Sequence, residues 1–225
     1  MKNVRMIARV FLYASILLSV GTQSFAEPMN LDLLKQELIT YHDSGAYEKD
    51  VAAVAAAANL YITSQVTANN QSNPQKKLAV VLDIDETVLS NYNGMIERKF
   101  NDDKLAIDKS ILRANAPALI PMLNLYNNLL KQKVAIFFVT GRSEQLKEAT
   151  ERNLKNAGYK EWAGLFLRPK AYNVASIVPF KTQARNAIAQ KGYTIIASIG
   201  DQNSDLIGGN AIKSFKLPNP YYYLS

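Results

Sequence analysis

The sequence predicts an α/β protein: a Rossmann-like parallel sheet with helices on both faces, and a small, mostly helical accessory or cap lobe. Short apolar runs rich in β-branched residues alternate with longer segments of helical composition. This alternation is typical of parallel strands that are joined by helices. The chain has 225 residues, which is enough for one domain with a sizeable core.

The first 26 residues have the pattern of a secretory signal peptide and not of a folded element. Residues 10–20 form an apolar run, and Ser24-Phe25-Ala26 has the small-x-small form of a cleavage site. The run is too short for a comfortable membrane span, and an uncleaved anchor is the alternative. We expect a mature chain that begins near Glu27, is secreted or periplasmic, and has no membrane anchor or later membrane span. The basic residues that open the segment are Lys2, Arg5 and Arg9.

The next segment, residues 27–77, is expected to form two helices and a linker. Residues 51–58 are mostly alanine, which is the strongest helix former. Residues 69–77 are polar, contain a proline and lack any period, as a linker does. The expected helices are 31–40 and 47–66, with Asn30 and Ser44 as their N-caps.

The core is expected to span residues 78–225. It begins with a predicted strand at 78–83, because this run is short, apolar and β-branched. Residues 90–113 lack a clear period, so we expect a loop-rich insertion over the end of that strand. Strands and helices then alternate along the rest of the chain. The expected helices are 117–131, 143–157 and 180–190, and the expected strands are 134–139, 165–167, 193–199 and 211–215.

Two aspartates, Asp83 and Asp85, stand at the carboxyl end of the first expected strand. In open parallel sheets, ligands bind at this edge. One carboxylate could attack a substrate while the other moves protons, and their oxygens also suit a hard cation such as Mg²⁺. Taken alone, the pair is also what an exposed acidic turn would contain.

The strand at 134–139 and the helix at 180–190 add groups that suit an anion. Thr140-Gly141-Arg142 follows the strand, where a hydroxyl and the backbone N–H groups of the next helix could hold a phosphate. Lys181 stands at the start of its helix and could reach the same edge to neutralise a phosphate. The alternatives are a simple strand-to-helix turn and a solvated surface lysine.

Two further carboxylates, Asp201 and Asp205, follow the expected strand at 193–199. They could be no more than an acidic helix cap. With Asp83 at a neighbouring strand end, however, the three acids would repel one another unless a cation neutralises them. The pattern therefore favours a divalent metal site with oxygen ligands.

Composition excludes several kinds of site and partner. Cysteine is absent and His42 is the single histidine, which excludes disulfides, a cysteine nucleophile, thiolate metal sites and His-rich zinc sites. The formal net charge of +7 falls to about +4 without the three basic residues of the signal segment. This modest charge helps to attract small anionic molecules and is also that of an ordinary soluble surface. The sequence has no dense block of lysine and arginine, so we expect no nucleic-acid polymer as a partner.

The ordered set Asp-x-Asp-x-Thr, Thr, Lys and Gly-Asp-x-x-x-Asp resembles the haloacid dehalogenase-like superfamily, from residue 78 to the C-terminus. The run 83–91, Asp-Ile-Asp-Glu-Thr-Val-Leu-Ser-Asn, is similar to the acid phosphatases of its third subclass. Three other segments resemble the branch with plant acid phosphatases, vegetative storage proteins and the similar secreted class C bacterial acid phosphatases. They are Tyr-His-Asp-Ser-Gly-Ala-Tyr at 41–47, Gly-Asp-Gln-Asn-Ser-Asp-Leu at 200–206 and Phe-Lys-Leu-Pro-Asn-Pro-Tyr-Tyr-Tyr at 215–223.

The resemblance implies a secreted, Mg²⁺-dependent acid phosphatase or nucleotidase that hydrolyses small phosphate monoesters through an aspartyl phosphate. Asp83 would be the nucleophile, and Asp85 would protonate the leaving alcohol and then activate water. Thr140, beside Gly141, would hold a phosphate oxygen, and Lys181 would neutralise the phosphoaspartate. Positioning and charge stabilisation of this kind suit phosphoryl transfer. The implied Mg²⁺ ligands are the Asp83 side chain, the Asp85 backbone carbonyl, Asp201, and Asp205 directly or through water.

Two other functions remain open on the same scaffold. One is a non-catalytic storage or binding protein, against which the intact nucleophile and metal-ligand positions argue. The other is a phosphotransferase, which passes the phosphoryl group to an alcohol instead of water. Glu86, between the acid pair and the threonine, is expected to be structural. Four aromatic residues could stack on a substrate ring or pack helix against core: Tyr41, Tyr47, Tyr92 and Phe100.

Overall fold

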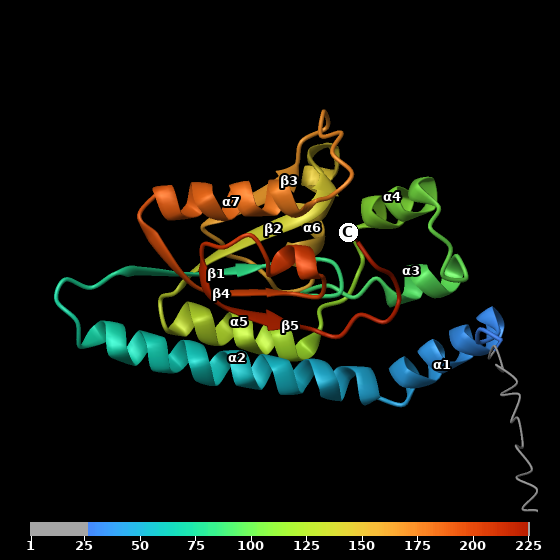
Figure 1. The fold of residues 1–225 in the computed structure, drawn as a ribbon, viewed down its shortest axis with the longest axis horizontal. Helices are drawn as coiled ribbons and strands as arrows, with labels where there is room; N and C mark the ends of the chain where they lie inside the picture. Colours follow the sequence, from blue (N-terminus) through green and yellow to red (C-terminus); the bar gives the residue numbers. More distant parts are fainter. Residues whose placement is uncertain (1–26, 225) are drawn as a thin grey trace, which may run out of the picture.

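The computed structural model describes residues 27–224, which fold around a five-stranded parallel sheet (Figure 1). The expected signal peptide, residues 1–26, lies outside this described part of the chain. The α/β fold class and the strands predicted from the sequence are confirmed. The strands are β1 (Lys77–Leu82), β2 (Ala135–Ser143), β3 (Gly164–Arg168), β4 (Tyr193–Gly200) and β5 (Ala211–Lys216).

The strand order, β3-β2-β1-β4-β5, has one point at which the direction of chain progress reverses. From β1 the chain adds β2 and β3 on one side, and it then returns to add β4 and β5 on the other. The reversal separates the loops that follow β1 and β4. Open α/β sheets bind their ligands at such a point, outside the carboxyl ends of the strands.

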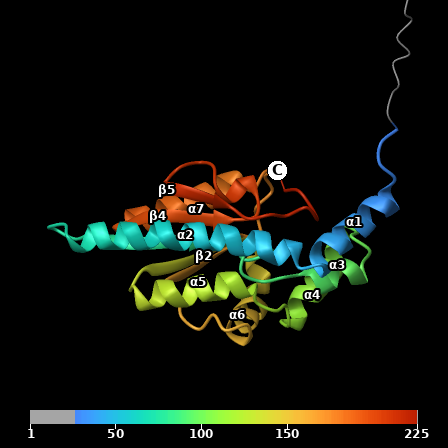
Figure 2. The ribbon, with the colours of Figure 1, turned by 90° about the horizontal axis from the view of Figure 1, so that it is seen from below.

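Helices bury both faces of the sheet (Figures 1 and 2). Along β1, Val80 and Leu82 pack in the larger core cluster with α2, α5 and α6, while Ala79 and Val81 pack in a smaller cluster with α7. This alternation follows from the two-residue period of a strand. The helices are α1 (Leu31–Asp43), α2 (Ala46–Asn70), α3 (Tyr92–Glu97), α4 (Lys104–Arg113), α5 (Ile120–Lys131), α6 (Lys147–Asn156) and α7 (Val178–Gln190).

The turn between the two N-terminal helices differs from the expectation. Asn30 caps α1 as predicted, because its side chain accepts hydrogen bonds from the N–H groups of Asp32 and Leu33. Ser44, expected as the N-cap of α2, instead ends α1, and the N-cap of α2 is Gly45. Gly45 has a φ of +80°, a conformation that glycine adopts without steric cost. The turn therefore depends on the glycine backbone, and the Ser44 hydroxyl supports it by donating to the Tyr41 carbonyl and accepting from the Ala46 N–H, both at 3.4 Å.

Helix α2 is long and apolar enough, by length and composition alone, to cross a membrane. The sequence predicted this helix at 47–66, but the expectation of no later membrane span did not weigh its length and apolar composition. In the structure, one stripe of α2 packs into the larger core cluster beside α5. The buried residues recur at helical spacing and so form one face. They are Tyr47, Val51, Ala55, Ala58 and Ile62.

The insertion after β1 contains two helices, which agrees with the mostly helical cap lobe of the predicted fold class, whereas the expectation of a loop-rich segment at 90–113 was wrong. Helices α3 and α4 have six and ten residues, which is too short for a periodic pattern to show. The two ends of the insertion run side by side. The Ser90 N–H donates to the Pro117 carbonyl (2.9 Å), and the Leu119 N–H donates to the Val88 carbonyl (3.0 Å). The resulting lobe stands beyond the carboxyl ends of the strands (Figure 1).

Candidate active site

The carboxyl edge of the sheet gathers three buried aspartates. Asp83 follows β1 directly, and Asp201 and Asp205 lie in the loop after β4. One carboxylate oxygen from each residue lies within 4.8 Å of the others. The structure therefore brings together three of the carboxylates that the sequence placed at neighbouring strand ends.

The loop after β4 folds back on itself and so directs its second carboxylate to the edge of the sheet. The Asp205 carboxylate accepts a hydrogen bond from the Gln202 N–H at 2.9 Å. The Ser198 hydroxyl donates to the Asp205 carbonyl at 2.7 Å. A Cβ at Gly200 would collide with the Asp205 side chain, so the close approach of this loop requires glycine.

Lys181 reaches this cluster from α7. Its ammonium donates a hydrogen bond to Asp83 Oδ1 at 2.8 Å and another to Asp205 Oδ1. The side chain is 3% exposed, so the alternative of a solvated surface lysine is excluded. Burial alone would lower the pKa of Lys181, but the two carboxylates outweigh it and raise that pKa. The ammonium therefore stays charged beside the aspartates.

The cluster carries more negative charge than Lys181 can balance. Burial raises the pKa of Asp83 well above its usual range, and the charge of Asp205 raises it further, against the opposing effect of Lys181. Burial and Asp205 raise the pKa of Asp201 in the same way. Burial is the largest cause of both pKa shifts, and the repulsion between neighbouring carboxylates adds to it. Oxygen ligands from converging carboxylates fit a hard divalent cation such as Mg²⁺.

Asp85 has a partner to which the sequence analysis assigned no role. The buried Arg142 guanidinium holds the Asp85 carboxylate through Nη2 (2.7 Å) and Nε (3.0 Å), and Asn91 Nδ2 donates at 2.8 Å. Burial alone would raise the pKa of Asp85, but Arg142 and Asn91 outweigh it, so the pKa lies below its usual value. Asp85 is therefore a carboxylate in this arrangement. In the sequence, the position of Arg142 directly after Thr140-Gly141 was the one sign that an arginine could reach Asp85.

Thr140 and Gly141 lie in β2, which continues to Ser143 instead of ending at residue 139. Thr140 is two residues beyond the last β1–β2 pair, level with the loop that follows β1. It is buried, and its hydroxyl accepts a hydrogen bond from the Arg142 N–H at 3.1 Å. The expected helix N-terminus does not follow directly, because a 3₁₀ turn, Glu144–Leu146, precedes α6.

Glu86 connects the loop after β1 to the lobe formed by α3 and α4 and to the C-terminal segment, residues 217–224. Its carboxylate accepts hydrogen bonds from the Asn91 N–H and the Tyr222 hydroxyl, both at 2.7 Å. Burial, with the charges of Asp85 and Asp201, raises the pKa of Glu86 to about 8. These contacts agree with the structural role that the sequence suggested.

Replacing Glu86 by glutamine is expected to flatten the pH dependence of stability. The folded chain holds this proton more tightly than the unfolded chain, because the pKa rises from 4.5 to about 8 on folding. The stabilising contribution is therefore complete below pH 4.5 and is lost as the pH rises towards 8. Each pKa unit corresponds to about 1.4 kcal/mol, so the wild type should lose up to a few kcal/mol over this range.

Urea unfolding of the metal-free protein across this pH range measures the effect. Exposed Glu148, replaced by glutamine, is the matched control and should keep the wild-type slope. Parallel pH profiles for the wild type and Glu86→Gln would contradict the prediction.

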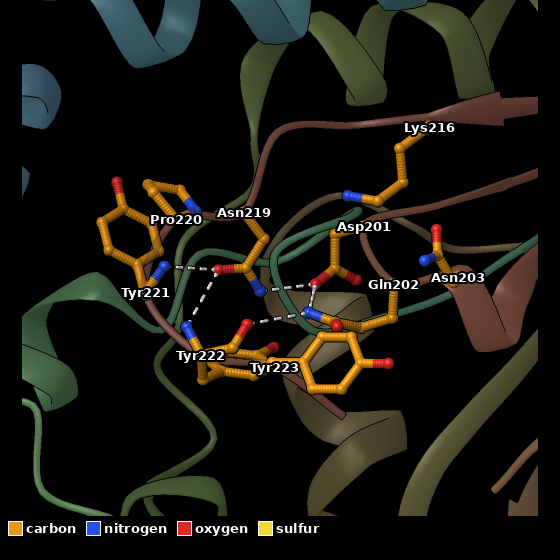
Figure 3. Close-up of a pocket in the computed structure, with 9 residues that line it drawn as sticks. All are labelled: Asp201, Gln202, Asn203, Lys216, Asn219, Pro220, Tyr221, Tyr222 and Tyr223. Atoms are coloured by element: carbon orange, nitrogen blue, oxygen red, sulfur yellow. Dashed lines mark hydrogen bonds between the residues drawn. The ribbon is translucent and has the colours of Figure 1, made fainter. Parts of the chain in front are cut away.

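A cavity of about 380 Å³ opens beside Asp201, between its loop and the C-terminal segment (Figure 3). Gln202 Nε2 and Asn219 Nδ2 both donate hydrogen bonds to Asp201 Oδ2, at 2.8 and 2.6 Å. Residues 215–223 resemble the acid phosphatases in sequence but were not predicted to take part in the site. The lining residues are Asp201, Gln202, Asn203, Lys216, Asn219, Pro220, Tyr221, Tyr222 and Tyr223.

The aromatic residues of the N-terminal helices and the cap pack on one another. Tyr47 and Tyr92 are buried, and the His42 ring stacks on Tyr92 with centroids 3.4 Å apart. Tyr221 of the C-terminal segment lies next to Tyr47 and Tyr92 and stacks on Phe100. For these rings the packing alternative describes the structure, and the cluster joins α1, α2, α3 and the C-terminal segment.

Known proteins resemble this chain in sequence and in fold. A family model described as HAD superfamily, subfamily IIIB (acid phosphatase) matches residues 10–225. Acid phosphatase 1 from Solanum lycopersicum is 38% identical over 148 residues, which cover 64% of this chain and 58% of that protein. Vegetative storage protein 2 from Arabidopsis thaliana is 30% identical over 197 residues, which cover 86% of this chain and 71% of that protein.

Among solved structures, the class C acid phosphatase from Bacillus anthracis has the same fold. Its TM-score is 0.69 at 21% sequence identity, and the superposition covers 85% of this chain and 86% of that one. This chain therefore spans most of the Bacillus structure but only 58% of the length of the Solanum relative.

Proposed function

This chain belongs to subfamily IIIB, the acid phosphatases, of the HAD superfamily, and from that premise we propose that it hydrolyses small phosphate monoesters with the help of Mg²⁺. The observation that carries the proposal is one buried cluster. In it, Asp83 contacts Lys181 and lies within 4.8 Å of two further carboxylates. A nucleophile, a cation for phosphate and a set of metal ligands thus meet at one edge. Phosphoryl transfer depends on such positioning and charge stabilisation.

In the proposed first step, a carboxylate oxygen of Asp83 attacks the phosphorus, and the bond between phosphorus and the ester oxygen breaks. Asp83 then carries the phosphoryl group as an aspartyl phosphate. Lys181, 2.8 Å from Asp83 Oδ1, remains beside this group and offsets its charge. The ammonium is held in place because it is buried and also bonded to Asp205.

Asp85 moves the protons in this proposal. In the first step it protonates the leaving alcohol, and in the second it takes a proton from the water that attacks the aspartyl phosphate. The pair with Arg142 supports the second role, because it keeps Asp85 ionised. A substrate phosphate that attracts the guanidinium would weaken the pair, so that Asp85 could hold the proton required for the first step.

Mg²⁺, when bound, supplies the positive charge that lets an anionic phosphate approach the carboxylates. Asp83, Asp201 and Asp205 would hold it through side-chain oxygens, and the family resemblance adds the Asp85 backbone carbonyl. Thr140 and Gly141 would face a phosphate oxygen. These assignments rest on the position of each residue at the carboxyl edge.

A storage protein on the same scaffold is the second candidate function, since the Arabidopsis relative is named as one. A storage role requires neither the buried Asp83–Lys181 contact nor the Asp85–Arg142 pair. Phosphate release by the wild-type chain separates the two functions, because a phosphatase hydrolyses phosphate monoesters and a storage protein does not.

Export is a further part of the proposal. It rests on the basic, apolar and small-x-small pattern of residues 1–26. The chain would then act outside the cytoplasm, on small phosphate monoesters.

Replacing Asp85 by asparagine is expected to slow the hydrolysis of alkyl phosphates more than that of activated aryl phosphates. General acid catalysis contributes about 10²–10⁴-fold, and a poor leaving group depends on it most. The measurement is kcat/KM for a series of phosphate monoesters whose leaving groups differ in pKa, with saturating Mg²⁺.

Exposed Asp108 on α4, replaced by asparagine, is the matched control and should behave as the wild type does across the series. Circular dichroism checks that Asp85→Asn folds although Arg142 loses its ion pair. An equal loss for every leaving group would argue against Asp85 as the acid.

A further inference from the structure

The C-terminal segment, residues 217–224, crosses the loop that carries the expected metal ligands (Figure 3). Leu217 is buried, and its N–H donates to the Gly200 carbonyl at 2.9 Å. Beyond it, the Tyr222 hydroxyl contacts Glu86 in the loop after β1. The segment therefore connects the two loops of the site, which come from opposite sides of the strand reversal.

The Asn219 amide has a defined orientation within this segment. Its Oδ1 accepts hydrogen bonds from the N–H groups of Tyr221 (2.9 Å) and Tyr222 (3.4 Å). An oxygen is required on that side, so the NH₂ group must face the other way, towards Asp201. There Nδ2 donates to Asp201 Oδ2 at 2.6 Å.

The two oxygens of Asp201 are used differently. Oδ2 accepts two amide hydrogen bonds, from Gln202 Nε2 and Asn219 Nδ2. Oδ1 accepts one hydrogen bond, from the Thr87 hydroxyl at 3.1 Å. Since a carboxylate oxygen offers two lone pairs, Oδ1 keeps one for a further partner. The amides thus fix the rotation of the carboxylate and leave a defined oxygen available.

We propose that Asn219 is a positioning residue for the metal ligand Asp201, an inference that rests on the proposed metal-dependent phosphatase function. It acts through the Asp201 carboxylate and touches neither the substrate nor the metal. Groups that orient a ligand in this way typically contribute 10- to 100-fold to metal affinity.

The same segment also holds the other amide donor. The Gln202 side chain accepts from the Leu224 N–H (3.1 Å) and donates to the Tyr222 carbonyl (3.3 Å). Both groups that orient Asp201 therefore depend on the path of residues 219–224. This path explains how a C-terminal segment without acids of its own takes part in the site.

The competing explanation is that Asn219 only forms a turn, because its Oδ1 binds two following N–H groups in the manner of an Asx turn. Asn219→Ser separates the two roles. A serine hydroxyl can cap the same turn, but it is too short to place a donor on Asp201. Asn219→Ala removes both roles.

The test is calorimetric titration of the metal-free full chain with Mg²⁺ alone, together with its thermal unfolding. Asn219→Ala and Asn219→Ser are both expected to raise the Kd for Mg²⁺ by about 10- to 100-fold. At saturating Mg²⁺ the variants should regain most of their kcat. The matched control is Asn203→Ala, since Asn203 is exposed on the same cavity and its side chain makes no hydrogen bond within residues 27–224.

Wild-type Mg²⁺ affinity in both variants, or in Asn219→Ser alone, would overturn the inference, because the turn would then be the only role. If Asn219→Ala fails to fold, Asn219→Ser still decides the question. If the wild-type chain releases no phosphate with Mg²⁺, the proposed function fails and the inference falls with it. If the wild type is active and neither variant changes the Kd, only the role of Asn219 is lost.

Discussion

Asp83→Asn is expected to abolish phosphate release while preserving the fold. An amide is too weak a nucleophile to form the aspartyl phosphate. Among the described carboxylates of the cluster, only Asp205 also contacts Lys181, and Asp205 lies in another loop. The fold should survive because burial and the Asp205 carboxylate both raise the pKa of Asp83, so a neutral side chain of the same shape relieves repulsion at this position. Phosphate release is measured with saturating Mg²⁺, and unfolding is followed by circular dichroism.

Asparagine at this position can deamidate back to aspartate, so the purified variant must be checked by mass spectrometry. Asp108→Asn, on the surface of α4, is the matched control and should keep full turnover. Near-wild-type turnover in a deamidation-free Asp83→Asn sample would refute the proposed nucleophile.

Removal of the metal is expected to have a comparably large effect. Without a divalent cation, the single ammonium of Lys181 faces three buried carboxylates, and an anionic phosphate would add to the repulsion. Activity should therefore disappear after chelation and return when Mg²⁺ is added. Zn²⁺ should restore less, because the site offers oxygen ligands without cysteine.

Two substitutions separate the metal from the phosphate contacts. Asp201→Ala should weaken Mg²⁺ binding in calorimetry, since it removes one ligand of the cluster. Lys181→Ala should largely keep Mg²⁺ binding and impair turnover, because the lysine acts on the phosphoryl group. Full activity in exhaustively demetallated protein would contradict both the metal assignment and this division of roles.

The main part of the candidate site could be predicted because parallel strands end at a common edge. Asp83 and Asp201 directly follow buried apolar runs, so the β1 and β4 patterns alone place them together. Lys181 was predictable as a residue that could reach this edge from a helix start. Its burial was not, because it depends on how α7 packs on the sheet.

The contacts that surround this cluster were harder to predict. Arg142 was visible in the sequence, but its direction depends on β2 running on to Ser143, beyond the apolar run that marks the strand. The Glu86–Tyr222 and Asp201–Asn219 hydrogen bonds depend on the return of a C-terminal segment that has no periodic pattern. Sequence periodicity reports on local structure and carries no information on such tertiary contacts.

Trapping the phosphorylated enzyme is the decisive test of the proposed mechanism, because in that mechanism the phosphoryl group passes through Asp83. The full chain is mixed with substrate and Mg²⁺, quenched in acid during turnover, and digested for mass spectrometry. We expect a phosphorylated peptide with the modification on Asp83, and no such peptide from Asp83→Asn. A phosphoryl group on another residue, or full turnover in the wild type with no phosphorylated peptide under conditions that preserve acyl phosphates, would contradict this mechanism.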